Sequence, residues 1–230
     1  MVQEGADWID VGGESTRPGS QGVSAEEEIR RVMPVVEALV DGGVSVSIDT
    51  SKPEVARRAL QAGALVVNDV GALRAPGMVE VVAEAGAGAV LMHMQGTPRT
   101  MQVAPAYDDV VEEVRVFLME RLACAQEAGI APIWLDPGIG FGKTLEQNLL
   151  LIRGLERFRA PGAGLYVGAS RKRFIGELNG VSHANARLAG SLGAAAASVA
   201  AGADVIRVHD VAETRRMLNV YLALSGSPDH

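Results

Sequence analysis

A carboxylate, three alternating glycines and a lysine stand close together in the stretch Trp134–Thr144, which reads Trp-Leu-Asp-Pro-Gly-Ile-Gly-Phe-Gly-Lys-Thr. The apolar residues at its start predict the end of a buried strand, and Asp136-Pro137 predicts a sharp turn directly after that strand. The glycines leave no side chains between a ligand and the backbone, and Lys143 adds a positive charge. The stretch therefore predicts the floor and one wall of a site for a planar or anionic ligand.

The end of this stretch is similar to a nucleotide P-loop, because Gly142-Lys143-Thr144 matches the end of the pattern G-x-x-x-x-G-K-[ST]. Pro137, however, stands where that pattern opens with a glycine, and the phosphate cradle needs the conformational freedom of that glycine. No acidic strand that would hold magnesium is evident either. The sequence disfavours an ATPase and favours a glycine turn that serves another ligand.

Polar residues follow other short apolar runs in the same way. The segments are Gly12–Gly19, Asp49–Lys52, Asn68–Val70, His93–Gly96, the stretch already described, Ser170–Arg173 and His209-Asp210. In a parallel barrel the carboxyl ends of all strands lie on one face, where active sites are found. We therefore expect these segments to meet at one site.

The side chains in these segments suggest roles. Asp49 and Asp136 are expected to accept hydrogen bonds from ring or amino N–H groups, whereas Asp69 and Asp210 are expected to cap the turns that follow them. Asn68 suits either the amide-like edge of a heterocycle or a turn.

Cationic side chains suggest an anion site. A positive patch that binds phosphate or carboxylate is expected from Arg17, Arg171, Lys172, Arg207 and His209.

Lysine is rare in this chain, which has eighteen arginines and three lysines, at 52, 143 and 172. All three follow predicted strands, so these positions suggest a need for lysine chemistry, although chance is the alternative in so small a sample. Lys52 is expected to be an ordinary surface residue at a helix start. His93, between two methionines, is expected to be a packed strand-end residue, and the four histidines show no metal-ligand spacing.

Seven short apolar runs alternate with longer amphipathic segments, as in successive βα units. The predicted strands are Trp8–Val11, Val44–Ile48, Leu65–Val67, Ala89–Met92, Ile133–Leu135, Leu165–Val167 and Val205–Val208. Helix candidates include Ala25–Val40, Pro53–Gln61, Asp108–Ala128, Leu145–Arg157 and Arg187–Ala201.

A glycine recurs just before several of these strands, at 5, 63, 86, 129 and 202, where it fits a helix C-terminal cap. The repeated module of roughly 20 to 40 residues favours a (β/α)8 TIM barrel over a doubly wound open sheet. We expect residues 1–230 to form a single domain.

Composition and net charge limit the classes of partner that we expect for this chain. A net charge of −7, with no basic stripe, argues against nucleic acid, and no apolar stretch is long enough to span a membrane. Cys124 is alone and is expected to be a helix-face residue, which agrees with a reducing cytoplasm.

Seven motifs together resemble the dihydropteroate synthase family, in order and over nearly the whole chain. They are Asp10-Val-Gly-Gly-Glu-Ser-Thr-Arg-Pro-Gly19, Ser47-Ile-Asp-Thr50, Asn68-Asp-Val70, Met92-His-Met-Gln-Gly96, Asp136-Pro-Gly-Ile-Gly-Phe-Gly-Lys143, Ser170-Arg-Lys172 and Arg207-Val-His-Asp210. The resemblance implies a barrel that condenses 6-hydroxymethyl-7,8-dihydropterin diphosphate with p-aminobenzoate to give 7,8-dihydropteroate and pyrophosphate. It also implies a sulfonamide target and a homodimer.

The resemblance further implies roles for single residues. The pterin would be bound by Asp49, Asn68, Val70, Met92, Asp136, Phe141, Lys172 and Arg207. The diphosphate would be bound by Arg17, Arg207 and His209, and the aminobenzoate by Thr16, Pro18, Phe141, Ser170 and Lys172. Asp49, Lys172, Arg207 and His209 would be the catalytic residues.

The family opens with a further strand and a loop whose asparagine helps to bind Mg2+, and this chain starts within the helix that follows. We therefore expect a barrel that lacks its first strand and loop, with seven βα units, two open strand edges and no metal ligand of its own. Two alternatives stay open: a truncated barrel that binds pterin without catalysis, and a barrel like that of methyltetrahydrofolate-dependent methyltransferases.

Overall fold

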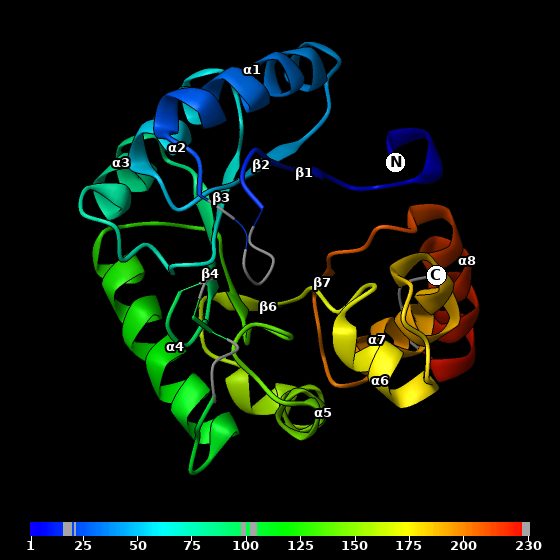
Figure 1. Cartoon of the computed structure of the whole chain (residues 1–230). Helices are drawn as coiled ribbons and strands as arrows, with labels where there is room; N and C mark the ends of the chain where they lie inside the picture. The colour runs from blue at the N-terminus through cyan, green and yellow to red at the C-terminus, as the bar shows by residue number, and fades with distance from the viewer. Residues whose placement is uncertain (16–19, 21, 98–99, 102–104, 227–230) are drawn as a thin grey trace.

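Short parallel strands alternate with helices in the computed structural model, which describes residues 1–15, 20, 22–97, 100–101 and 105–226. The strands are β1 (Ile9–Gly12), β2 (Val46–Asp49), β3 (Val66–Asp69), β4 (Gly88–Met92), β5 (Ile133–Asp136), β6 (Ala163–Val167) and β7 (Val205–Ile206). They form one sheet in the order β1 to β7, and every neighbouring pair is parallel. The curved sheet is therefore an open (β/α) barrel with helices around its outside (Figure 1).

Helices follow the strands in the described part of the chain. They are η1 (Val2–Glu4), α1 (Ala25–Asp41), α2 (Pro53–Gln61), α3 (Met78–Glu84), α4 (Val110–Glu127), α5 (Leu145–Arg153), η2 (Leu155–Phe158), α6 (Arg173–Asn179), η3 (Ala184–Arg187), α7 (Leu188–Ala200) and α8 (Val211–Ser225). None of these described helices combines the length and the apolar character that crossing a membrane requires.

All seven predicted strands are confirmed, with ends shifted by a residue or two. The doubly wound alternative is wrong, because its strand order would reverse along the sheet, whereas this order is linear. The predicted helix Leu145–Arg157 is divided at Gly154, which ends α5 and precedes η2. The five glycines before strands all have positive φ, between 61° and 103°, as expected of helix C-terminal caps.

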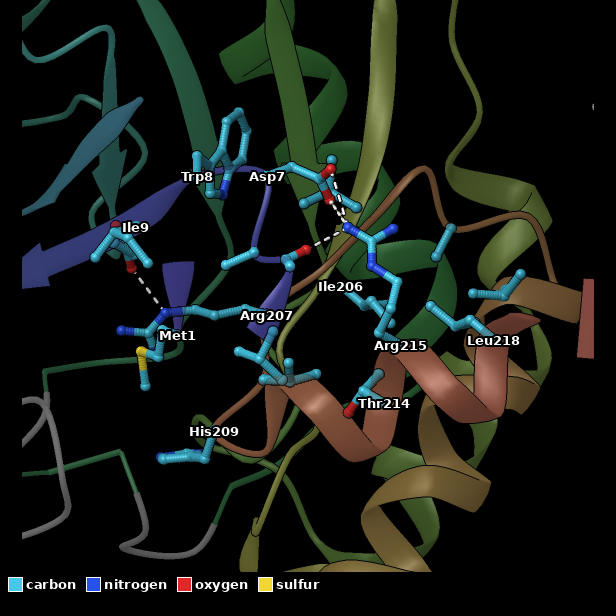
Figure 2. A pocket seen from close by; sticks show the side chains of 18 of the residues that line it. Met1, Asp7, Trp8, Ile9, Ile206, Arg207, His209, Thr214, Arg215 and Leu218 are labelled. Atoms are coloured by element: carbon cyan, nitrogen blue, oxygen red, sulfur yellow. Dashed lines mark hydrogen bonds and ion pairs between the residues drawn. The ribbon is translucent and has the colours of Figure 1, made fainter. Parts of the chain in front are cut away.

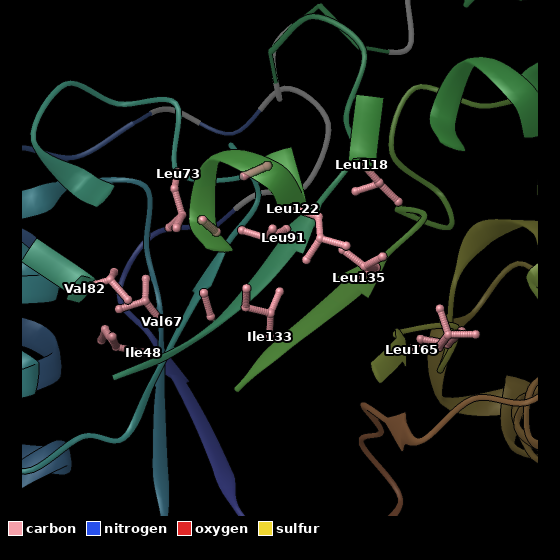
Figure 3. Packing of buried hydrophobic residues seen from close by; sticks show 14 of the residues in the cluster. Ile48, Val67, Leu73, Val82, Leu91, Leu118, Leu122, Ile133, Leu135 and Leu165 are labelled. Carbon is pink, nitrogen blue, oxygen red and sulfur yellow. The ribbon is translucent and has the colours of Figure 1, made fainter. Parts of the chain in front are cut away.

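The core lies between the outer face of the sheet and the helices, because alternate side chains of a strand point to opposite faces. In Figure 3, Leu91 and Leu135 of neighbouring strands point towards Leu118 and Leu122 of α4. On the inner face, the lower part of the barrel is filled by Val66, Val90, Tyr166, Trp8 and Trp134. The inner positions above this apolar layer carry the polar residues of the site.

The sheet begins at β1 and ends at β7, and we call the space between these two strands the seam. A cavity of about 640 Å³ lies along it, lined by Met1, by residues 5–10, by β7 and by α8 (Figure 2). Two arginines cross the seam: Arg215 donates to Gly5 and Asp7, and Arg207 donates to Asp10. Side chains of α8 and of the segment after β7 thus connect the two ends of the sheet.

Candidate active site

Strand register brings inner-facing polar residues near one another at the carboxyl end of the sheet, with Met92 and Asp136 two residues further along their strands than the row that contains Asp49 and Asn68. Asp49 of β2 is paired with Asn68 of β3, and Met92 of β4 is paired with Asp136 of β5. Asp10 of β1 lies two residues before the position paired with Asp49, so it points to the same face slightly lower. These residues form a polar layer at the carboxyl end of the apolar filling, and the two overlap in register, because Asn68 is paired with Val90.

Carboxylates on β1 and β2 hold an arginine that follows β7. Arg207 donates from Nε to Asp10 at 2.7 Å and from Nη2 to Asp49 at 3.2 Å. Asp10 also accepts a hydrogen bond from the Asn68 amide at 2.9 Å. Burial, followed by the charge of Asp10, raises the pKa of Asp49 to about 7, against the opposing effect of Arg207. Asp49 is thus balanced between its two protonation states near neutral pH.

Asp136 is buried and directed by the glycine turn that follows it. Its carboxylate accepts a hydrogen bond from the Gly138 N–H at 2.7 Å. Gly138 has φ 71°, and a Cβ there would collide with the carbonyl oxygen of His93, so this turn needs glycine. Burial raises the pKa of Asp136 although the Gly138 bond and nearby Lys172 lower it. The turn therefore presents a carboxylate while lying close under the site.

Lys143 does not reach the site, which corrects the expectation that it supplies a binding charge. It is buried, and its ammonium donates to the carbonyl oxygens of Phe141 at 2.9 Å and His93 at 3.3 Å. Burial lowers the pKa of Lys143 to about 7. It holds the glycine turn against the strand end rather than meeting a ligand.

Lys172 and Phe141, in the loops that follow β6 and β5, lie together in the site. The Lys172 ammonium is 3.9 Å from the centroid of the Phe141 ring, a cation–π distance. Burial lowers the pKa of Lys172 to about 8. Phe141 also packs on a small cluster that contains Val70 and Met92, together with Met94 and Met101. The three apolar residues predicted for the pterin therefore share one surface.

Ser170 and His209 are neighbours at the carboxyl ends of β6 and β7. The Ser170 hydroxyl is 3.1 Å from His209 Nδ1 and accepts a hydrogen bond from the His209 backbone N–H at 3.2 Å. Arg171, expected in the positive patch, instead pairs with Asp210 through Nε at 3.0 Å. The Asp210 side chain makes no cap bond to α8, so its expected capping role is wrong.

Two further expectations are settled by side-chain contacts. Lys52 starts α2 as expected, but it is not an ordinary surface residue, because it forms ion pairs with Glu14 and with the buried Glu28. Asp69 does cap its turn, since it accepts hydrogen bonds from the N–H groups of Gly71 and Leu73, both at 2.7 Å.

The two remaining side-chain expectations agree with the structure. His93 is packed, and burial lowers its pKa to about 3. Cys124 is a free thiol within α4.

The structure brings together Asp49, Asn68, Val70, Met92, Asp136, Phe141, Lys172, Ser170, Arg207 and His209 at the carboxyl end of the sheet. Thr16, Arg17 and Pro18 lie outside the described residues. Sequence reasoning placed Asp10 at or near a strand end and included Asp10 and its partner Ser47 in the motifs, but it gave neither of them a role in this group. The available signal was their alternation with Val11 and Ile48 in apolar runs, which places both on the inner face.

The first comparison concerns families. Residues 1–209 match the model of a family described as pterin binding enzyme. The chain is 50% identical to dihydropteroate synthase of Escherichia coli (strain K12) over 233 aligned positions, which cover 100% of this chain and 82% of that protein.

Solved structures agree with the family comparison. Xanthomonas albilineans dihydropteroate synthase with 4-aminobenzoic acid superposes with a TM-score of 0.93 and 48% identity, over 99% of this chain and 82% of that chain. The complex from the same organism with 7,8-dihydropteroate gives a TM-score of 0.88 and 44% identity, over 99% and 82% of the two chains.

Proposed function

The chain belongs to the dihydropteroate synthase family of pterin-binding enzymes, and from this premise we propose how its residues perform the reaction. The family's members are transferases of folate biosynthesis. The proposed reaction joins 6-hydroxymethyl-7,8-dihydropterin diphosphate to p-aminobenzoate and gives 7,8-dihydropteroate and pyrophosphate. The observation that carries the assignment is the layer of inward carboxylates, amide and cations at the carboxyl end of one barrel.

The pterin would lie above the glycine turn. Asp136 and Asp49 supply carboxylates for ring and amino N–H groups, and Asn68 and Lys172 complete the polar edge. Val70, Met92 and Phe141 form one apolar surface beside them, which suits the flat face of the ring. Arg207, between the two carboxylates of β1 and β2, would border the pterin and reach its diphosphate.

The diphosphate and the aminobenzoate would lie nearer to the mouth of the site than the pterin ring. Arg207 and His209 supply positive charge and hydrogen-bond donors for the diphosphate, together with Arg17. Ser170, Lys172 and Phe141 would border the aminobenzoate, together with Thr16 and Pro18. These assignments are supported by the neighbouring positions of Ser170 and His209 and of Lys172 and Phe141.

The chemistry needs little acid or base help. The bond between the pterin methylene carbon and the diphosphate oxygen breaks with its electron pair on the oxygen, while the aminobenzoate nitrogen forms the new bond and releases one proton to solvent. Asp49 and the Phe141 ring would stabilise positive charge that develops at the methylene, and Arg207 and His209 would stabilise the leaving group. Much of the rate would come from positioning.

Magnesium, the oligomer and the compartment are further parts of the proposal. The family resemblance implies Mg2+, an ion that commonly binds through one or two carboxylates together with substrate phosphates. Within the described residues no group of three or more His, Cys, Asp or Glu side chains could hold a metal ion, and no step is assigned to Mg2+. The family resemblance supports a homodimer and a cytoplasmic location. We also propose that residues 1–230 act as one pterin-binding domain.

A coupled assay tests the function. Purified chain, pterin diphosphate and p-aminobenzoate should release pyrophosphate and form dihydropteroate, and omission of either substrate should abolish both signals. Calorimetric binding of the pterin diphosphate without turnover would support the non-catalytic alternative. Methyl transfer from methyltetrahydrofolate to a cobalamin acceptor would support the methyltransferase-like alternative.

A further inference from the structure

Asp10 has no part in the chemistry proposed above, yet its carboxylate lies at the centre of the polar layer. It accepts three side-chain hydrogen bonds: from Ser47 Oγ at 2.6 Å, from Asn68 Nδ2 at 2.9 Å and from Arg207 Nε at 2.7 Å. Its side chain is only 7% exposed. One inner-facing carboxylate therefore links β1, β2, β3 and the segment after β7.

The contact with Asn68 fixes the direction of an amide. A carboxylate accepts hydrogen bonds and has none to donate, so Asn68 must turn its NH2 group towards Asp10. The carbonyl oxygen of Asn68 then points the other way, and it presents an acceptor to any ligand in the site. Asp10 thereby fixes the side on which Asn68 presents its carbonyl oxygen, the acceptor that an N–H group of a heterocycle needs, while the NH2 group carries a second N–H besides the one bonded to Asp10.

The contact with Arg207 fixes a guanidinium. Arg207 donates from Nε to Asp10 and from Nη2 to Asp49. Two carboxylates thus bind adjacent N–H donors of the planar guanidinium. Nη1 takes part in neither bond. The same contact crosses the seam, where β1 and β7 are not paired in the sheet (Figure 2). Without Asp10, one of the two groups that hold Arg207 in place would be lost.

We propose that Asp10 is a positioning residue, which orients the Asn68 amide for a pterin N–H and holds the Arg207 guanidinium for the attached diphosphate. This inference rests on the proposed function of the same site. It concerns the pterin diphosphate alone, because among the described residues Asp10 bonds to Ser47, Asn68 and Arg207, and none of these is proposed for the aminobenzoate.

The test is Asp10→Asn, which keeps the shape and removes the charge. We expect KM for the pterin diphosphate to rise about tenfold or more, the loss of one charge-assisted hydrogen bond. KM for p-aminobenzoate, measured at saturating pterin, should change less than about twofold. Calorimetric binding of the pterin diphosphate should weaken by the same factor as KM rises.

The pH profile supplies a readout that a merely structural role would not move. The groups that act on Asp49 are Asp10, Asp69 and Glu28, which raise its pKa, and Arg207, which lowers it. Removal of the Asp10 charge should lower the pKa of Asp49, so the acid limb of kcat/KM for the pterin diphosphate should move to lower pH.

Two variants keep the result interpretable. Asp204→Asn alters a carboxylate at the opposite end of β7, which accepts the Leu165 N–H at 2.7 Å, and it should leave the pterin KM and the acid limb unchanged. Ser47→Ala removes one donor but keeps the Asp10 charge and its bonds to Asn68 and Arg207, so it should fold and raise the pterin KM about threefold, less than Asp10→Asn does.

The inference is overturned if Asp10→Asn folds with the pterin KM and acid limb of the wild type, or, where Asp10→Asn fails to fold, if Ser47→Ala has no effect on the pterin KM. Failure of the wild-type chain to bind the pterin diphosphate is a different result, since it would overturn the proposed function and this inference with it.

Discussion

Asp136 shows how the backbone can set the role of one side chain. The Gly138 N–H holds one carboxylate oxygen, and burial keeps water from competing for the group. A carboxylate in this setting is a strong acceptor for a ring or amino N–H, because the hydrogen bond is charge-assisted and desolvated. The position therefore suits recognition of a nitrogen-rich heterocycle.

Asp136→Asn should weaken binding of the pterin diphosphate by about 10- to 100-fold, corresponding to about 1.5–3 kcal/mol for a hydrogen bond to a charged group. Isothermal titration calorimetry gives the affinity directly. Asp109→Asn is the control, because Asp109 also accepts backbone N–H groups, those of Val111 and Glu112, but it caps α4 and is none of the residues of the proposed site. Equal affinities of wild type and Asp136→Asn would remove Asp136 from the pterin site.

The pKa values of Asp49 and Lys172 predict a narrow pH optimum. Burial raises the pKa of Asp49 to about 7 and lowers the pKa of Lys172 to about 8. If the carboxylate and the ammonium are the active forms, kcat/KM for the pterin diphosphate rises with pH through about 7 and falls through about 8.

Lys172→Arg tests the alkaline limb, because a guanidinium keeps its proton throughout this range. Its kcat/KM should be lower than that of the wild type but should no longer fall near pH 8. An alkaline limb that stays in place in Lys172→Arg would assign that limb to another group.

At the scale of elements, the loop between β5 and α5 is held from both ends. Thr144 and Gln147 form a capping box at the start of α5, while Lys143 donates to two carbonyl oxygens beneath the glycine turn. The Gly140 N–H also donates to Asn148 of α5 at 2.6 Å. A rigid loop of this kind keeps Asp136 and Phe141 at fixed places in the site.

Lys143 should make stability depend on pH in a way that Lys143→Met abolishes. Burial lowers its folded-state pKa to about 7, so between about pH 7 and its ordinary value of 10.5 the unfolded chain binds a proton that the folded chain lacks. The contribution of Lys143 to stability is therefore fully present above 10.5 and is lost as pH falls through about 7.

Denaturant unfolding across this range should show the wild type gaining stability relative to Lys143→Met as pH rises, with a slope approaching about 1.4 kcal/mol per pH unit. Measuring the difference between the two proteins cancels groups that titrate in both. A pH-independent difference would mean that Lys143 keeps its ordinary pKa in the folded state.

The elements were more predictable from the sequence than the contacts between them. The seven strands are short apolar runs, and local composition is sufficient to find them. The contacts of Asp10 and Lys52 could not be predicted in this way, because their partners are distant in the chain: Arg207 lies 197 residues from Asp10, and Glu28 lies 24 residues from Lys52. Lys143 was misjudged because the direction of a side chain after a glycine turn depends on positive φ values at 138, 140 and 142.

At the scale of the molecule, the strands of the sheet differ in how many neighbouring strands they pair with. β4 and β5 each have a neighbour on both sides, whereas β1 and β7 end the sheet, and β7 has only two residues. Local opening is easiest where few hydrogen bonds and few packed side chains must be broken. The ends of the sheet should therefore open more often than its middle.

Hydrogen exchange measured by NMR or mass spectrometry should show the slowest amides in β4 and β5 and the fastest strand amides in β1 and β7. The amide hydrogens of β2 and β6 should exchange at intermediate rates, because each of these strands has two neighbours but lies next to an end strand. Protection of β7 equal to that of β4 would show that the seam is closed in solution, for example by self-association through the open edges.

The proposed ligand would span the seam between β1 and β7. Asp49 and Asn68 stand on one side of it, and Arg207 and His209 stand on the other, so a bound pterin diphosphate would touch both. Such a ligand would also stabilise the structure, because part of its binding free energy would hold the two edges of the sheet, β1 and β7, next to each other. Binding should therefore slow hydrogen exchange in β7 more than in β4, and it should raise the melting temperature with ligand concentration.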